Sequence, residues 1–483
     1  MKLSLDWRSF NPRVMALGAI MALATVAVGA LLGYTGLIIT LGVLVTLAAA
    51  LWVLTSLEVA LWGVVAVITL LPFGALPLKI VVTPTFLDLA MLAVAAVYTF
   101  QWMTGRRWQI ALTPAHGPLA LFLALAVFSF AAGMSNGPLT SNLLRHFVEL
   151  LFNIAFVFVI VDYLASREKL DRLILVIIIC GTLAAAAGIV FYFMPETLST
   201  RLLSALRVFN YPADNVLRYI EDDPANAQRA ISTSVDPNVL GGLLALVGAL
   251  LAPQLVARRP LLRWRWLSWG AFGVVVVCLL LTYSRTALAA LGVALAGIAL
   301  ARYRRLLWLI LLVALVIALV PVTQTYEAHL LQGLQGQDLA TQMRFGEYKD
   351  AFILIGRHPW LGVGFAGAPE IDTYLGVSSA YLIMAEEMGV VGLAGFLFII
   401  AVVLGWSFVN RRAVYADERL TPVWLGAHAG LAAALTVGVA DHYFFNLDFQ
   451  PSGAIFWIFV ALCLAATRLA TRQARVSEHS FGS

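Results

Sequence analysis

Residues 344–395 read RFGEYKDAFILIGRHPWLGVGFAGAPEIDTYLGVSSAYLIMAEEMGVVGLAG, and they join a polar, glycine-rich segment to a long apolar run. Apolar side chains recur at helical spacing from Arg344 to Ile355, which predicts a short amphipathic helix there. The glycines and proline of HPWLGVGFAG predict a tight turn after that helix. The apolar run that follows carries two adjacent acids, Glu386 and Glu387. Because this is the largest polar and irregular block in the chain, we look for the chemistry around it.

The rest of the chain is dominated by long apolar runs. Of its 483 residues, 61% are hydrophobic and 12% are charged, and the mean hydropathy is +0.91. A soluble chain carries roughly 25% charged residues. Only helices and closed barrels satisfy their backbones in lipid, and these runs are continuous rather than alternating. We therefore predict an all-α, multi-pass integral membrane protein.

The apolar runs predict about fourteen membrane spans, within a range of about twelve to fourteen. The predicted spans are Val14–Leu32, Leu37–Leu54, Val59–Leu71, Phe86–Met103, Pro118–Met134, Phe147–Tyr163, Leu173–Met194, Val239–Val256, Leu267–Tyr283, Thr286–Ala301, Leu306–Val322, Ala380–Trp406, Val423–Val439 and Ala454–Ala466.

Arginines and lysines gather in alternate short connections, which sets the expected orientation. By the positive-inside rule these connections, and both termini, are cytoplasmic. We treat residues 1–483 as one transmembrane domain, whose long connections 195–238 and 323–379 face the opposite, extracytoplasmic side. Connections this long are usually functional. The second of them carries the predicted amphipathic helix, which we expect to contain active-site residues.

Composition and motifs exclude several classes of function. The net charge of +5 comes from cations in short loops, so it does not predict nucleic-acid binding. The three cysteines lie inside apolar runs, so we expect no disulfide. The chain has neither the ligand spacing of a metal site nor a P-loop, so we predict no metal, nucleotide or other cofactor.

Two extracytoplasmic arginines stand at predicted helix starts, where a cation opposes the helix dipole. Arg285 lies in TYSRTALAALG, and Arg344 opens the amphipathic helix. A guanidinium presents a planar fork that suits phosphate oxygens, so the pair suits a diphosphate. Alternatively, Arg285 contacts lipid headgroups, and Arg344 forms a local ion pair with Glu347.

Three residues on this side are candidates for a general base, in the order His442, Glu387 and Asp236. His442 follows Asp441, and an acid beside an imidazole can relay protons, although neighbours on a helix diverge. Glu387 is an ionisable group near the mouth of a membrane helix. Asp236 precedes Pro237, so it fits equally well as a helix cap.

Further polar residues are assigned to the same side of the membrane. Arg145 alternatively forms an i, i+4 ion pair with Glu149, and His358 alternatively only shapes the turn before Pro359. The residues assigned to the substrate cavity are Arg145, Tyr348, His358, Ser378 and Tyr381.

Three ordered segments resemble the O-antigen ligase and O-antigen polymerase superfamily of bacterial membrane glycosyltransferases. They are DPNVLGG at 236–242, TYSRTALAALG at 282–292, and RFGEYKDAFILIGRHPWLGVGF at 344–365 followed by AYLIMAEEMGVVGLAG at 380–395. The resemblance implies a helical, GT-C-like fold with a large extracytoplasmic loop over a cavity. It also implies glycan transfer from an undecaprenyl-diphosphate donor to an acceptor at the outer face of the bacterial plasma membrane. The arginines that match Arg285 and Arg344 would hold the diphosphate, and we assign Arg229 to the same site.

One position departs from the family pattern. Ligase-type members carry a histidine where this chain has Ser378, and a seryl hydroxyl is no general base near neutral pH. We therefore expect an enzyme of the ligase or polymerase type whose base lies elsewhere. Its expected partners are a polyprenyl-diphosphate-linked oligosaccharide, a glycan or lipid-glycan acceptor, and membrane lipids. A flippase for lipid-linked oligosaccharides is the alternative, but a flippase needs a charged path through the membrane, and the mid-span positions carry almost no charge. A peptidoglycan-type polymerase would require a lipid-linked disaccharide peptide.

Overall fold

The computed structural model describes residues 52–77, 83–105, 110–212, 214–319, 339–367 and 376–481. Contacts divide the chain into two units, residues 1–59 and residues 60–483, and the membrane helices from α4 (Phe86–Met103) onward belong to the second unit. The first predicted span, and the second up to residue 51, lie outside the described residues.

The described part of the chain is almost entirely helical, with one small antiparallel hairpin of β1 (Arg218–Tyr219) and β2 (Gln228–Arg229). The helices are α3 (Leu57–Leu70), α4 (Phe86–Met103), α5 (His116–Ala132), α6 (Ser141–Tyr163), α7 (Arg167–Phe193), α8 (Glu196–Ala205), α9 (Pro237–Val256), α10 (Arg265–Leu281), α11 (Arg285–Ala301), α12 (Leu307–Leu319), α14 (Leu339–Arg357), α15 (Ala380–Val409), α16 (Arg411–Ala416), α17 (Leu420–Ala440) and α18 (Gln450–Phe481). This confirms the all-α prediction.

Within the described residues, eight helical segments are long and apolar enough to cross a membrane, and α3, α10 and α11 are shorter apolar helices. The chain is therefore a multi-pass membrane protein. Each predicted span from the third onward corresponds to a helix. The total of about fourteen and the side on which the termini lie remain predictions.

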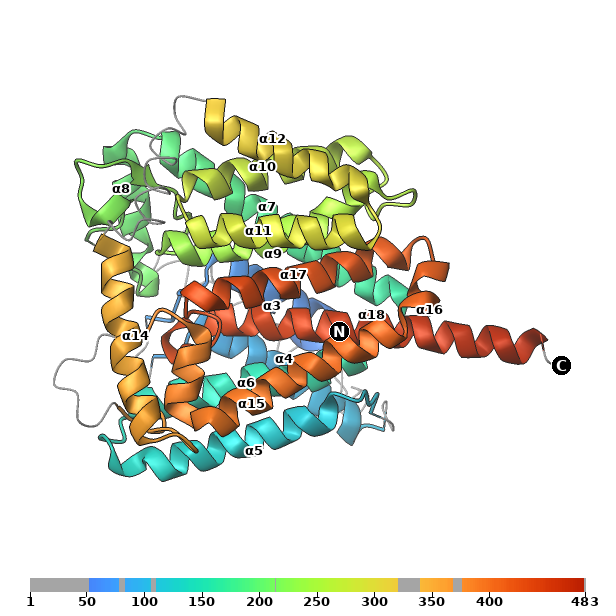
Figure 1. Cartoon of the computed structure of the whole chain (residues 1–483), viewed down its shortest axis with the longest axis horizontal. Coiled ribbons are helices and arrows are strands. Elements are labelled where there is room, and N and C mark those ends of the chain that lie inside the picture. The colour runs from blue at the N-terminus through green and yellow to red at the C-terminus, as the bar shows by residue number, and fades with distance from the viewer. Residues whose placement is uncertain are drawn as a thin grey trace, which may run out of the picture. The chain divides into compact units, whose positions relative to one another are not determined.

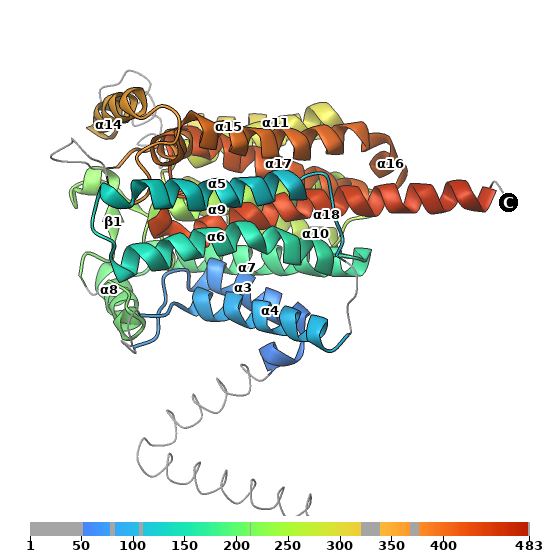
Figure 2. The same cartoon turned by 90° about the horizontal axis from the view of Figure 1, so that it is seen from below.

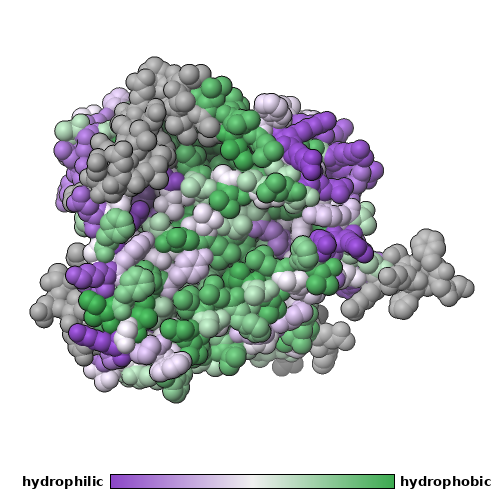
Figure 3. Space-filling view, viewed as in Figure 1, coloured by the Kyte–Doolittle hydropathy of each residue, from purple (hydrophilic) through white to green (hydrophobic). Residues whose placement is uncertain are grey.

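The membrane helices run between two ends, as both views of the ribbon show (Figures 1 and 2). The loop end carries α8, α14 and residues 282–284 and 441–449. The basic end carries α16 and the connections 257–264 and 302–306. Figure 3 shows apolar side chains gathered between hydrophilic ones at the two ends. This is the distribution that a membrane-spanning bundle requires.

Helices α9 and α18 form the centre of the bundle, and nearly all their membrane residues are buried. Helices α7, α10, α11 and α17 pack around α9, while α6 and α17 pack on α18. Glycines permit the close approaches, as expected in membranes. A Cβ at Gly426 would press on the backbone of Leu250, and one at Gly430 would collide with Phe459.

Helix α15 is interrupted at Gly389, which the sequence analysis did not predict. Gly389 has φ +69°, and a Cβ there would collide with the Trp360 carbonyl. The turn after α14 fills the break: Val363 N–H donates to the Glu386 carbonyl at 2.8 Å, and Val390 N–H donates to the Pro359 carbonyl at 2.8 Å. The glycine-rich turn thus provides backbone hydrogen-bond partners for the break in the helix that follows it.

Candidate functional site

Several helix ends converge at the loop end around one group of charged residues. The N-termini of α9 and α11 approach the C-terminus of α17, and the first N–H of α15, at Ala380, donates to the Asp441 carbonyl at 3.1 Å. Helix N-termini carry partial positive charge and favour anions. We call the residues gathered here the polar cluster: Arg229, Asp236, Arg285, Arg344, Asp441 and His442.

Arg344 and Asp441 bring α14 onto the end of α17. Nη2 of Arg344 lies 3.6 Å from Oδ1 of Asp441, and the two side chains are 23% and 7% exposed. Burial raises the pKa of Asp441 to about 7, although the positive charges of Arg344 and Arg229 lower it and the charge of Asp236 raises it. A carboxyl group with that pKa exchanges protons near neutrality.

Arg229 is a partly buried arginine, and two of its N–H donors bind other parts of the protein. Its Nε–H donates to the Thr282 carbonyl at 2.8 Å, and Nη2 donates to Oδ1 of Asn238 at 2.7 Å. Burial lowers the pKa of Arg229, nearby carboxylates raise it, and Arg285 lowers it. Arg229 therefore fixes the turn before α11, and with it Arg285, against the start of α9.

Asp236 caps α9, which is one of the two roles that the sequence allowed. Its Oδ1 accepts from the N–H groups of Asn238 at 2.7 Å and Val239 at 3.0 Å, and Pro237 occupies the first turn. The same side chain acts electrostatically on Asp441 and His442. Capping and membership of the cluster are therefore compatible.

The glycine pair of DPNVLGG explains how the cluster is assembled. A Cβ on Gly241 would press against Ser284, the residue before Arg285. A Cβ on Gly242 would collide with the hydroxyl of Tyr443, two residues after Asp441. Only glycine lets α9 lie this close to both segments.

The hydrogen bonds around His442 define its tautomer. Oδ1 of Asn446 accepts from the Asp448 N–H at 2.9 Å, which orients the Asn446 amide nitrogen toward Nδ1 of His442 at 3.0 Å. Nδ1 is then the acceptor, so neutral His442 carries its proton on Nε2. Burial lowers the pKa of His442, so the neutral imidazole predominates at neutral pH. In this state His442 is a hydrogen-bond donor through Nε2.

Ser378 lies beside the cluster, against α14. Its backbone N–H donates to Oε2 of Glu347 at 2.9 Å, and its carbonyl accepts from the Tyr348 hydroxyl at 3.2 Å. Burial raises the pKa of Tyr348, while Arg344 lowers it. Ser378 thus contacts α14 about one turn away from Arg344.

Other predicted residues take structural positions. The Tyr381 hydroxyl donates to the Leu435 carbonyl at 2.7 Å, which ties α15 to α17. His358 follows the last turn of α14, and its carbonyl accepts from Gly362 N–H at 3.1 Å. The Glu387 carbonyl accepts from Gly364 N–H at 2.9 Å and from the Ser129 hydroxyl at 2.6 Å. The described contacts of these three residues hold the α15 break and its surroundings together.

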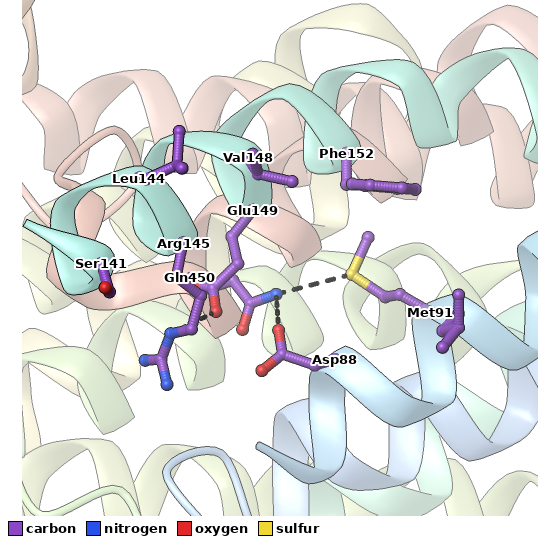
Figure 4. A pocket seen from close by; sticks show the side chains of 10 residues that line it. Asp88, Met91, Ser141, Leu144, Arg145, Val148, Glu149, Phe152 and Gln450 are labelled. Carbon is purple, nitrogen blue, oxygen red and sulfur yellow. Dashed lines mark hydrogen bonds and ion pairs between the residues drawn. The ribbon is translucent and has the colours of Figure 1, made fainter. Parts of the chain in front are cut away.

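Arg145 lines a separate pocket of about 440 Å³ between α4, α6 and α18 (Figure 4). Its Nε lies 3.0 Å from Oε1 of Glu149, which realises the predicted ion pair, and Nη1 donates to the Thr83 carbonyl at 2.6 Å. Nη2 lies 3.0 Å from Nε2 of His146, whose ring in turn contacts Asp448 at 3.2 Å. Arg145 therefore reaches the His442 segment only through intermediate residues.

The sequence does not identify Asp441 as a member of the polar cluster in its own right. As neighbours on a helix, Asp441 and His442 would diverge, but α17 ends at Ala440 and both residues lie beyond it. Asn446 was also missed, because its role depends on folding back onto His442. Among the described residues, no group of three or more His, Cys, Asp or Glu lies close enough to hold a metal ion.

Comparison with known proteins adds one match. Residues 270–397 match the family described as O-antigen ligase. The match includes Arg285, Arg344 and the turn that fills the α15 break, whereas Asp236 and Asp441 lie outside it. A search of curated proteins returned no significant match. The family match supports the O-antigen ligase and polymerase superfamily and confirms the resemblance seen in the sequence.

Proposed function

We propose, from the O-antigen ligase match and the polar cluster together, that this protein transfers a glycan from an undecaprenyl-diphosphate-linked donor to an acceptor hydroxyl. The reaction takes place at the outer face of the bacterial plasma membrane and needs no metal or nucleotide. The observation that carries the proposal is the ion pair of Arg344 and Asp441 at one end of an apolar helical bundle, with Asp441 hydrogen-bonded to Thr286, the residue after Arg285.

In this proposal the arginines stabilise the leaving group. The acceptor oxygen attacks the anomeric carbon, the bond from that carbon to the diphosphate oxygen breaks, and its electron pair leaves with the diphosphate. Arg285 and Arg344 neutralise the charge that develops there, which is the main electrostatic task of such a site. The N-termini of α9 and α11 add positive potential, and Arg229 holds Arg285 in place.

We assign the general base to Asp441. The other two candidates already use their acceptor atoms within the protein. Oδ1 of Asp236 accepts from two backbone N–H groups of the α9 cap, and Nδ1 of His442 accepts from Asn446. Asp441 has a pKa of about 7, which suits a base that accepts the acceptor proton near neutral pH. His442 then serves as a donor to a substrate oxygen through Nε2. This assignment gives the chain a base without a histidine at position 378.

We further propose that the loop end faces outward and the basic end faces the cytoplasm, with both termini on the cytoplasmic side. Connections 195–238 and 323–379 are then extracytoplasmic. The apolar band between the two ends gives lipid-linked substrates access from the membrane. Concentration of the polar cluster at one end favours a one-sided enzyme over the alternative, a flippase, which needs polar groups along its whole path.

The test is transfer by the purified protein. Polyprenyl-diphosphate oligosaccharide is supplied alone and with a second acceptor, and the products are compared with those of Arg285→Ala and Arg344→Ala. A ladder from donor alone identifies a polymerase, and product only with the second acceptor identifies a ligase. Both require that the arginine variants lose product while remaining folded. No product with any donor, together with donor movement across proteoliposome membranes, would overturn the proposal in favour of a flippase.

A further inference from the structure

A second cavity, of about 600 Å³, lies at the basic end, opposite the polar cluster. It is enclosed by the segment 110–114 before α5, the end of α6, the last turn of α15 and residues 468–472 of α18. We call it the basic-end cavity. The residues that line it are Ile110, Ala111, Leu112, Pro114, Asp162, Ala165, Trp406, Arg468, Thr471 and Arg472.

The charge in this cavity is positive. Arg468 and Arg472 lie one turn apart on α18, so both guanidinium groups reach the same space. The buried Nη1 of Arg468 has no hydrogen-bond partner among the described residues. Asp162 is the acid in the lining, and its two oxygens accept from Ala111 N–H at 3.0 Å and from the Tyr98 hydroxyl at 3.2 Å. Two arginines therefore face one carboxylate, which leaves a site for an anion.

The cavity also has an apolar side. Ile110 and Leu112 are among the exposed large hydrophobic residues. Trp406 stands just before the end of the apolar helix α15, which is followed at once by Asn410, Arg411 and Arg412. Tryptophan in such a position is typical of the membrane–water boundary. A ligand here meets cations and hydrocarbon-compatible side chains together, so the cavity suits an amphiphile rather than a free ion.

We propose that the basic-end cavity binds the phosphate headgroup of an anionic phospholipid between Arg468 and Arg472, with the lipid chains leaving past Ile110 and Leu112. A guanidinium pair binds phosphate oxygens by several N–H donors. Because one carboxylate offsets one arginine, the remaining positive charge matches a lipid with one net negative charge better than a zwitterion. Basic pockets of this kind are known anchoring points for acidic lipids. This site is independent of the proposed glycan transfer.

The experiment measures lipid binding to the full-length, delipidated protein by native mass spectrometry. The probes are dioleoyl-phosphatidylglycerol, dioleoyl-phosphatidylcholine and inorganic phosphate. We expect phosphatidylglycerol to bind in preference to phosphatidylcholine. Because one arginine contributes about 1 kcal/mol to such binding, Arg472→Ala is expected to weaken phosphatidylglycerol binding about fivefold. Arg472→Lys is expected to retain most of it.

The control is Arg412→Ala, since Arg412 is exposed at the same end but does not line the cavity. Equal weakening by Arg412→Ala and Arg472→Ala would reduce the effect to general attraction and overturn the proposal. Absence of a preference between the two lipids would do the same. Displacement of the lipid by millimolar inorganic phosphate would assign the cavity to a free anion instead. Arg472 is exposed, so its replacement is expected to leave the unfolding midpoint of lipid-free protein unchanged.

Discussion

Nη2 of Arg344 lies 3.6 Å from Oδ1 of Asp441, and this contact joins α14 to the residue that follows α17. The arginine belongs to the polar, glycine-rich block 344–395, and the acid lies two membrane helices later, after α17. Their meeting places a cation suited to phosphate beside a carboxyl group whose pKa lies near 7. A group suited to leaving-group stabilisation and a group suited to proton removal thus lie close together, and transfer to a hydroxyl uses both functions.

The raised pKa of Asp441 predicts the pH dependence of transfer. A general base acts in its deprotonated form, so a pKa of about 7 means that the rate rises with pH through about 7 and levels off above 8. Below pH 6 the rate is expected to fall about tenfold per pH unit. An aspartate at its ordinary pKa would instead keep the rate constant down to about pH 5.

The measurement is the initial transfer rate between pH 5 and 9, with Asp441→Asn as the matched variant. We expect Asp441→Asn to lose about 10²–10⁴-fold in rate and to lose the pH dependence of the remainder. A wild-type rate that stays flat between pH 5 and 8 would contradict the assignment of Asp441.

The tautomer of His442 predicts that an amide can replace it. Because Nδ1 of His442 accepts from Asn446, the proton of the neutral ring is on Nε2. Glutamine can present a comparable N–H and alanine cannot. We expect His442→Gln to keep the transfer rate within about tenfold of wild type and His442→Ala to lose about 10²-fold, as for loss of one donor to a developing charge. Transfer rates at fixed, saturating donor give the comparison. Equal and severe losses in both variants would instead identify His442 as the base.

Most of the fold followed from the sequence, because membrane helices are set by continuous apolar runs. The predicted span Phe86–Met103 is the observed α4, and Val239–Val256 differs from α9 only at its start. The break in α15 could not be predicted, since its backbone partners at Pro359 and Val363 come from another segment. Hydropathy indicates which residues form a membrane helix, but it does not indicate which other segment interrupts that helix.

The site was predictable in part. Arg285 and Arg344 stand out in the sequence because a cation at a helix start opposes the helix dipole. Arg285 does begin α11, but α14 begins at Leu339, so Arg344 lies in its second turn and not at its start. Their role in binding a diphosphate stays a prediction. Arg229, assigned to the diphosphate, binds the Thr282 carbonyl and Asn238, contacts that depend on a distant turn and that the sequence does not indicate. Its role at the diphosphate stays a prediction. Arg145, assigned to the cavity, lies in another pocket with Glu149. Burial raises the pKa of Asp441. Because that burial depends on the packing of several helices, the sequence alone does not reveal it.

The close packing of α9 predicts that Gly242 cannot be enlarged. A methyl group there would collide with the Tyr443 hydroxyl, and overpacking of this kind costs about 1–3 kcal/mol. We expect Gly242→Ala to lower the thermal unfolding midpoint and to displace Asp441, so that transfer falls as well. The control is Gly292→Ala on α11, where a Cβ meets open space. Equal midpoints for the two variants would show that α9 does not hold the cluster through this contact.

The distribution of cations predicts which end of the bundle faces the cytoplasm. Thr200 on α8 is exposed at the loop end, and Arg412 on α16 is exposed at the basic end. In a variant without the native Cys180, Cys278 and Cys463, we introduce Thr200→Cys or Arg412→Cys and treat intact spheroplasts with a membrane-impermeant maleimide. Because positive charge is retained in the cytoplasm, labelling is expected at position 200 before lysis and at position 412 only after lysis. The reverse pattern would turn the polar cluster toward the cytoplasm, where a donor presented at the outer face cannot reach Arg285 or Arg344, and would thereby contradict both the orientation and the outer-face reaction.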